Sequence, residues 1–174
     1  MIESIRAVAR TLNDAGVEYL VVGGVAVVLH GYLRQTQDLD LVLRMTRENI
    51  LAAVDGLASL GYHPTAPVDP RDLADPIVRS QWITDKGMTV LSLVSPRHPS
   101  LVVDLFAVEP FDMEPELKDR IDADLDGIRL PVVSIHGLIR MKEQVGRAND
   151  RVDIEHLRRI RDLNHQESGS EGEA

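Results

Sequence analysis

The stretch VVGGVAVVLHGYLRQTQDLDLVL, from Val21 to Leu43, decides the fold. A run rich in β-branched residues from Val17 to Val22 predicts a buried strand, which Gly23–Gly24 ends. We expect a short helix over Val25–Leu29 and a second strand over Asp38–Leu43. Glycines between a strand and a helix let the backbone approach a ligand closely, and the start of a helix offers unpaired N–H groups to an anion. The two glycines therefore predict either an anion site or a plain tight turn.

The rest of the chain alternates between helical and strand periods. Expected helices run from about Ile5 to Gly16, from Thr46 to about Leu60, over 115–120, over Ser134–Val145 and from Asp150 to about Leu163; further strands are expected at Met88–Val94, Leu101–Val108 and, at a sheet edge, Ile128–Val133. A Pro-rich stretch from His63 to Pro76 is expected to be a surface loop. This order predicts an α/β (α+β) fold, a small mixed β-sheet flanked by helices, with a C-terminal helical pair over residues 134–163.

Composition narrows the class of protein. The chain has 174 residues, 44% of them hydrophobic, and this length suits one domain, which we place at residues 1–165. The small, acidic ending predicts a disordered tail over residues 166–174. There is no cysteine, no apolar run of membrane-spanning length and no signal-peptide pattern, so a cytoplasmic protein is expected. A net charge of −9 argues against a broad nucleic-acid footprint, although residues 134–163 carry seven Lys or Arg against five acidic residues.

Three carboxylates are the candidate metal ligands. In a strand, Asp38 and Asp40 share one face, and two like charges there repel unless a cation lies between them. A hard divalent ion such as Mg²⁺ is one partner for this pair, and a solvated strand face that pairs with arginines is the alternative. Asp104 is apolar on both sides in LVVDLF and needs a partner, either a metal or an arginine. If its strand lies beside Asp38–Leu43, the three acids fit a two-metal site for in-line displacement.

These residues carry a family resemblance. The order Gly23-Gly24, Asp38-x-Asp40 and a distant Asp104 resembles the nucleotidyltransferase (DNA polymerase β-like) superfamily. More closely, GGVAVVLHG with Arg34, Thr36 and DLDLVL, followed by LIRMKEQVGRANDRVDIEHL, resembles the small bacterial AbiEii and minimal-nucleotidyltransferase type, several of which are toxins of toxin–antitoxin pairs. The resemblance spans about residues 5–163.

The resemblance implies an activity and a set of roles. Gly23 and Gly24 would hold a triphosphate, while Asp38, Asp40 and Asp104 would bind Mg²⁺ or Mn²⁺. Asp104 would also take the proton of an acceptor hydroxyl that attacks the α-phosphate of an NTP. The acceptor would be tRNA, a protein or a small molecule, and an antitoxin is an implied partner. One position departs from the superfamily's Gly-Ser, because Gly24 replaces the serine.

Lys142 is the candidate cation of the C-terminal helices. It falls inside the apolar stripe of its helix, and Asp153 falls inside the stripe of the next. Either the two form a buried bridge, or Lys142 reaches the nucleotide's phosphates and Asp153 orients it. Arg34 and Arg147, both in connections, are further candidate phosphate ligands.

The sequence leaves three functions in competition. The leading one is a Mg²⁺-dependent nucleotidyltransferase. The second is a nucleotide-binding or regulatory module that keeps the fold without turnover, which the glycine at position 24 favours. A divalent-metal phosphodiesterase is the third, because three acids can also position a water molecule.

Overall fold

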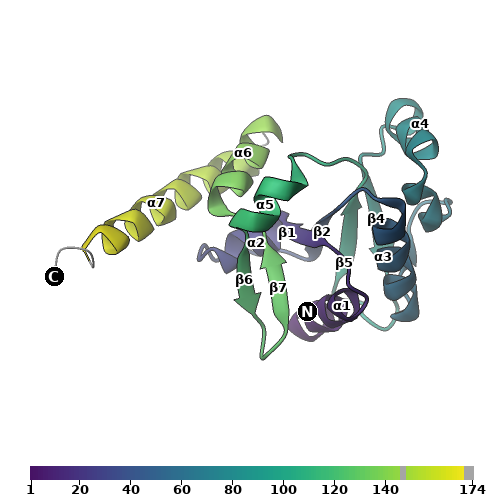
Figure 1. Cartoon of the computed structure of the whole chain (residues 1–174), viewed down its shortest axis with the longest axis horizontal. Coiled ribbons are helices and arrows are strands. Elements are labelled where there is room, and N and C mark those ends of the chain that lie inside the picture. The colour runs from purple at the N-terminus through teal and green to yellow at the C-terminus, as the bar shows by residue number, and fades with distance from the viewer. Residues whose placement is uncertain (146–147, 171–174) are drawn as a thin grey trace.

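A mixed β-sheet forms the centre of the molecule (Figure 1). The computed structural model describes residues 1–145 and 148–170. Within them the sheet has seven strands in the order β3-β4-β5-β2-β1-β7-β6. The strands are β1 Tyr19–Val22, β2 Asp38–Leu43, β3 His63–Pro64, β4 Val90–Val94, β5 Val102–Phe106, β6 Ile121–Asp124 and β7 Arg129–Val132. β2 runs parallel to β5 and antiparallel to β1, so the mixed sheet expected from the sequence is confirmed.

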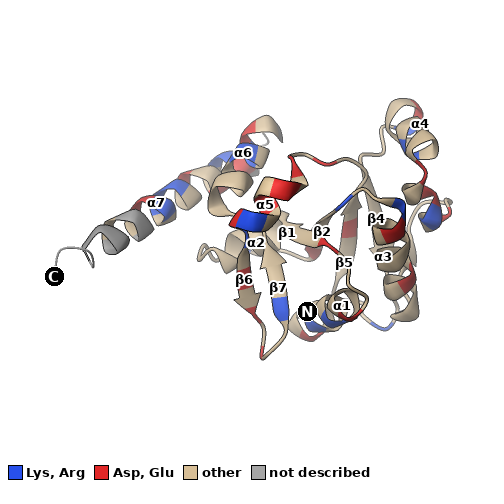
Figure 2. Cartoon of the chain, in the orientation of Figure 1, with Lys and Arg blue, Asp and Glu red and all other residues tan. Residues whose placement is uncertain are grey.

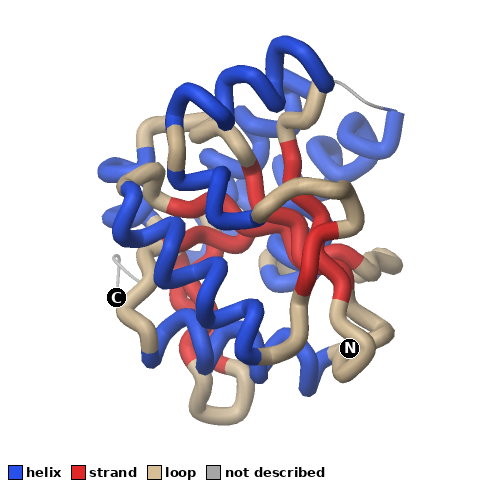
Figure 3. The backbone as a smooth tube through the Cα atoms, turned by 90° about the vertical axis from the view of Figure 1, so that its right-hand side faces the viewer, coloured by secondary structure: helices blue, strands red, loops and turns tan. Residues whose placement is uncertain are grey.

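Helices lie to either side of the strands (Figure 3). They are α1 Ile2–Asp14, α2 Gly23–Leu29, α3 Arg47–Ser59, α4 Pro76–Lys86, α5 Met113–Asp119, α6 Ile135–Val145 and α7 Ala148–Ser170, with a 3₁₀ turn at Pro70–Ala74. Thr46 and Ser134, where two of the expected helices start, cap α3 and α6: the hydroxyl of Thr46 accepts from the Asn49 amide, and that of Ser134 accepts from the Gly137 amide. The C-terminal pair α6 and α7 pack against each other as expected.

The sheet centre forms the core because β1 is buried on both faces and β2 and β5 are each apolar and buried on one face. All four residues of β1 are buried, as are Leu39, Leu41 and Val42 of β2. Trp82 of α4 also lies in the core. This packing fixes β2 and β5, which carry the candidate acids, in the middle of a rigid layer.

Two elements differ from the sequence expectation. The strand predicted at Ile128–Val133 is β7, but it is not at the sheet edge, because β6 pairs with its outer side. The sequence IDAD of β6 has the polar character typical of an edge strand and offers no apolar run to detect.

The Pro-rich stretch from His63 to Pro76 was expected to be a surface loop, but it contains β3 and the 3₁₀ turn, in which Leu73 and Ala74 are buried. α4, a helix that the sequence did not predict, begins at Pro76; Asp75 caps its start and Gly87 ends it in the left-handed conformation.

α7 is longer than expected and projects from the body of the molecule (Figure 1). It continues to Ser170 instead of ending near Leu163, so residues 166–170, expected in a disordered tail, are helical in the structure. Residues 171–174 lie outside the described residues. Within the described part of the chain, none of the helices combines the length and the apolar character needed to cross a membrane.

Candidate active site

The three candidate carboxylates come from the adjacent strands β2 and β5. Asp40 lies directly opposite Asp104 in the parallel pair, and Ser92 of β4 lies opposite Asp104 on its other side. Asp38 is two residues before Asp40 and therefore points to the same face. The row Asp40–Asp104–Ser92 thus crosses three strands. The condition set by the sequence, that the strand of Asp104 lies beside Asp38–Leu43, is met.

A cavity of about 710 Å³ opens over this row. Its volume lies in the range of small-molecule sites. Besides Ser92, the polar residues that line it are Gly23, Gly24, Arg34, Thr36, Asp38, Asp40, Thr89, Asp104, Lys142 and Asp150. Apolar side chains, among them Val90, Phe106, Leu138 and Met141, form the remainder of the wall. The cavity therefore offers acids, cations and an apolar surface to one ligand.

Burial and mutual repulsion set the charge of the carboxylates. Burial is the main cause that raises the pKa of Asp40 to about 6, and the nearby Asp104 and Asp38 raise it further. A hydrogen bond from the Gly24 backbone and the positive charge of Lys142 act in the opposite direction. Burial also raises the pKa of Asp104, against a stabilising hydrogen bond from Ser92. Both acids would ionise more readily beside an added cation.

The donor set fits a divalent metal in chemistry. Hard cations such as Mg²⁺ take oxygen ligands, and the row supplies carboxylate oxygens. Among the residues that the structure describes, Oδ1 of Asp104 is buried without a hydrogen-bond partner, which is the state of an oxygen that lacks its ligand. Across the same described residues, no three Asp, Glu, His or Cys side chains stand close enough together to hold a metal ion as they are placed. Metal binding therefore belongs to the proposal below.

The two glycines make room for neighbouring side chains. Gly23 has a φ of +63°, and a Cβ there would lie 2.5 Å from Cγ of Asp40 and overlap its Oδ2. The backbone of Gly24 hydrogen-bonds Asp40. α2 begins at Gly23, two residues earlier than expected. The sequence expected these backbone groups to face a triphosphate, and in the structure one of them is bonded to the Asp40 carboxylate.

Lys142 and Arg34 meet at one buried carboxylate. Nζ of Lys142 lies 2.8 Å from Oδ2 of Asp153 and 3.0 Å from Oδ1 of Asp150. Nη1 of Arg34 lies 2.6 Å from the same Oδ2 of Asp153. Asp153 is only 3% exposed and Lys142 only 7%. The buried bridge that the sequence suggested exists, and its two cations also line the cavity.

Some residues of the cavity were not singled out from the sequence, and one residue that was singled out lies outside the described residues. Ser92, Asp150 and Phe106 line the cavity without a prior role. Ser92 and Phe106 could have been found, because in the alternating patterns LSLV and VVDLF they occupy the non-core positions of their strands. Arg147, a candidate phosphate ligand, lies outside the described residues.

Comparison with solved structures gives a fold family. The chain superposes on the lincosamide antibiotic adenylyltransferase LnuA, in its lincomycin-bound form, with a TM-score of 0.55 and 15% identity over 85% of this chain and 90% of that one. It also superposes on ANT(2")-Ia in complex with adenylyl-2"-tobramycin, with a TM-score of 0.56 and 11% identity over 96% and 98%. The chain has the nucleotidyltransferase fold.

A third structure agrees with this result. A candidate nucleotidyltransferase from Thermotoga maritima matches with a TM-score of 0.56 and 15% identity over 94% of this chain and 92% of that one. No family model and no curated protein matches at the level of sequence. The nucleotidyltransferase fold is thus shared across nearly the whole length of the chain. The sequence identities are too low to assign a substrate to this chain from these structures.

Proposed function

We propose that the chain is a nucleotidyltransferase that uses Mg²⁺ or Mn²⁺ to move an NMP from an NTP to an acceptor hydroxyl. The observation that carries the proposal is the cavity itself. Asp38, Asp40 and Asp104 lie on one sheet face, and Arg34 and Lys142 line the same cavity. Acids that hold a cation and cations that hold phosphates are the two halves that phosphoryl-type transfer requires.

The roles of the chain's own groups follow from their chemistry. Asp38, Asp40 and Asp104 would hold the metal, which when bound neutralises phosphate charge. Arg34 and Lys142 would contact phosphate oxygens and orient the triphosphate. The acceptor oxygen forms a bond to the α-phosphorus, the bond from that phosphorus to the bridging oxygen breaks, and pyrophosphate leaves. Asp104 would accept the proton that the hydroxyl loses.

The acceptor class is the finer part of the proposal. Two of the structurally similar proteins were solved with a small molecule bound, one with lincomycin and the other with adenylyl-2"-tobramycin. A concave, partly apolar cavity of about 710 Å³ suits a small hydroxyl compound beside a nucleotide. A tRNA or protein acceptor, an antitoxin partner and the AbiEii branch stay predictions from the sequence resemblance.

A second candidate is a nucleotide-binding regulatory module without turnover. It is favoured by Asp153, which pairs with both Arg34 and Lys142 in this structure. Because Arg34 and Lys142 are already paired with this buried carboxylate, a phosphate would have to compete with Asp153 for them. Nucleotide binding without transfer would support this candidate.

Label transfer tests the proposal. The purified protein is incubated with each α-labelled NTP, MgCl₂ or MnCl₂, and either tRNA, the protein itself or a set of hydroxylated small molecules. We expect transfer that falls by at least about a hundredfold in Asp38→Asn, Asp40→Asn and Asp104→Asn. Asp14→Asn, at an exposed position at the end of α1, is the matched control and should transfer normally. Transfer that persists in all three cavity variants would contradict the metal assignment.

A further inference from the structure

Arg34, Thr36, Asp38 and Asp40 form an alternating run along one segment. Residues 32–37 precede β2 without helical structure, and all four side chains at even positions line the cavity. The odd-numbered neighbours lie on other sides: Leu33, just before the run, is 84% exposed, and Leu39, between the two acids, is buried in the core. Thr36 therefore places a hydroxyl between the Arg34 cation and the first carboxylate.

Gly24 and Thr36 share one space. A Cβ at position 24 would lie 2.5 Å from Oγ1 and 2.9 Å from Cβ of Thr36. Gly24 has no positive φ, so its backbone conformation does not require glycine. A rotation about χ1 would move Oγ1 of Thr36 but not its Cβ, so the overlap could not be relieved by the side chain alone. Position 24 is glycine because Thr36 fills the place where a side chain would be.

The hydroxyl of Thr36 has only a weak partner. It donates to the carbonyl oxygen of Asp38 over 3.3 Å, longer than the 2.5–3.0 Å typical of O–H···O bonds. Its proton can therefore turn toward an anionic oxygen in the cavity at little loss. The Arg34 guanidinium lies close by, with Cζ 3.4 Å from the same Cβ position at residue 24. A phosphate held by Arg34 at this place would meet the hydroxyl.

We propose that Thr36 is a phosphate-binding residue, whose hydroxyl supplies from the β2 side the hydrogen bond that a hydroxyl side chain at position 24 would otherwise supply from α2. This inference rests on the proposed function, because the phosphate is that of the NTP. It identifies a binding residue from the β2 segment and explains the absence of a side chain at position 24.

Isothermal titration calorimetry of the full chain tests this role. The probes are ATP, GTP, CTP and UTP with MgCl₂, each compared with its nucleoside. Thr36→Val keeps the branched shape and removes the hydroxyl, and Thr36→Ser keeps the hydroxyl. We expect Thr36→Val to bind the preferred NTP at least about tenfold more weakly, Thr36→Ser to stay within about threefold of wild type, and nucleoside binding to be unchanged in both. A purely structural threonine would not separate the triphosphate from the nucleoside.

Exchange of the hydroxyl between the two positions is the second measurement. Gly24→Ser alone should weaken NTP binding by steric overlap, and Thr36→Gly alone should weaken it by loss of the hydroxyl. The double variant Gly24→Ser/Thr36→Gly should bind more tightly than either single variant, since it moves the hydroxyl across the shared space. This comparison also decides the matter if Thr36→Val does not fold.

Different outcomes separate the two proposals. If the wild type binds none of the four NTPs, the proposed function fails and this role fails with it. If the wild type binds an NTP and Thr36→Val binds it equally well, the phosphate role of Thr36 is wrong while the proposed function stands. A double variant that binds the NTP no more tightly than the better of the two single variants would also overturn the phosphate role of Thr36.

Discussion

Asp40 shows how one residue's surroundings link stability to function. Its carboxyl is pressed against the diglycine turn on one side and Asp104 on the other, and burial raises its pKa to about 6. The unfolded chain would release this proton near pH 4. Between these two values the folded state holds the extra proton, so the free energy of unfolding contributed by this group falls as pH rises from about 4 to about 6. At neutral pH the ionised, buried carboxyl therefore lowers the free energy of unfolding, and a cation bound beside it would offset this loss.

Replacement of Asp40 by asparagine should remove this dependence. We expect Asp40→Asn to raise the free energy of unfolding relative to wild type at pH 7, and to raise it less at pH 4, where the folded carboxyl is already protonated. Urea unfolding at both pH values is the measurement. MgCl₂ at pH 7 should stabilise wild type and leave Asp40→Asn nearly unchanged.

Asp14→Asn, exposed at the end of α1 and not among the residues that line the cavity, serves as the control and should behave as wild type in both measurements. A wild-type protein whose stability rises between pH 4 and pH 6 by as much as that of Asp40→Asn would contradict the role given to Asp40.

At the scale of elements, the sequence predicted best what local pattern determines. Asp38–Leu43 was placed with both its bounds correct, because polar and apolar residues alternate there and the buried side is fully apolar. The outer strand Ile121–Asp124 was missed, because an exposed edge needs no apolar residues. That β5 pairs with β2 could only be stated as a condition, since strand neighbours are chosen by long-range packing that no local pattern records.

The same contrast holds for the site. The acids of β2 and β5 could be named from strand alternation and from the cost of a buried charge. The pairing of Lys142 with Asp153 could be named from their places in the apolar stripes of two helices. That Arg34 joins the same carboxylate could not, because it depends on where residues 31–37 lie against α7. Thr36 belonged to the quoted motif, but its contact with Gly24 appears only in three dimensions.

The turn between β1 and α2 provides a test at this scale. Gly23 and Gly16 both have left-handed backbones, with φ of +63° and +67°, but a Cβ at Gly16 meets no atom within 4 Å. Gly16→Ala should therefore cost only the conformational term, roughly 1–2 kcal/mol. Gly23→Ala should cost clearly more, because its Cβ overlaps the Asp40 carboxylate. Equal losses in thermal or urea unfolding would mean that Asp40 does not pack against this turn.

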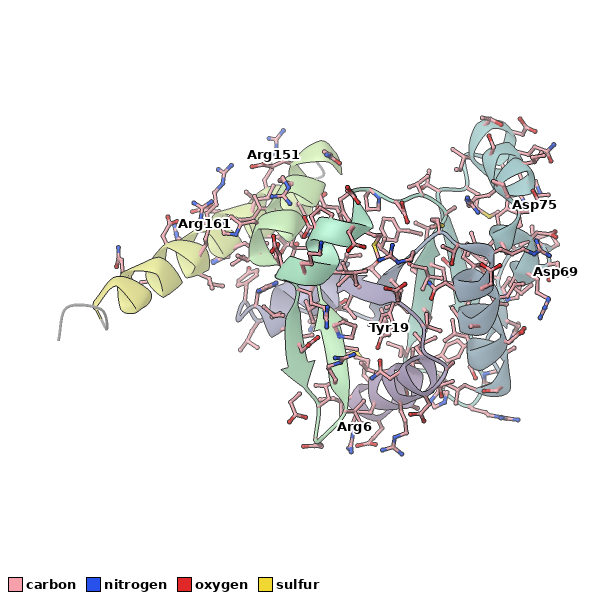
Figure 4. All side chains as sticks on the ribbon, viewed as in Figure 1. Arg6, Tyr19, Asp69, Asp75, Arg151 and Arg161 are labelled. Carbon is pink, nitrogen blue, oxygen red and sulfur yellow. The ribbon has the colours of Figure 1, made fainter. Side chains whose placement is uncertain are left out.

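At the scale of the whole molecule, the C-terminal helix holds the site loop in place. The ring of Tyr32 stacks on that of His156 at 3.8 Å, and Cδ1 of Ile160 reaches the space beside Gly31. Together with the Arg34–Asp153 pair, these contacts fasten residues 31–37 to α7. Arg151 and Arg161 lie on the same helix (Figure 4), and Figure 2 shows further basic residues along it. α7 is thus part of the cavity wall through Asp150, and it also projects from the body of the molecule.

Asp153 is the residue through which this helix acts. Asp153→Asn should lower the free energy of unfolding by about 2–3 kcal/mol, because two cations would lose a buried anion while Asp150 still pairs with Lys142. Glu155→Gln, two residues along and paired only on the surface with Arg159, should change it by less than about 0.5 kcal/mol. Urea unfolding compares the two. A loss in Asp153→Asn no greater than in Glu155→Gln would show that the pair does not fasten the loop.

The alternation of Arg34, Thr36, Asp38 and Asp40 means that the cavity depends on an even spacing between the residues that line it. Each step along an extended chain advances roughly 3.3 Å and reverses the side to which side chains point. Deletion of a single residue such as Gln37 would turn the guanidinium and the hydroxyl away from the carboxylates, whereas deletion of two would restore their side and shorten their reach. An insertion or deletion of an odd number of residues in this segment would therefore separate Arg34 and Thr36 from the carboxylates at once. A change of an even number would keep all four side chains on one side.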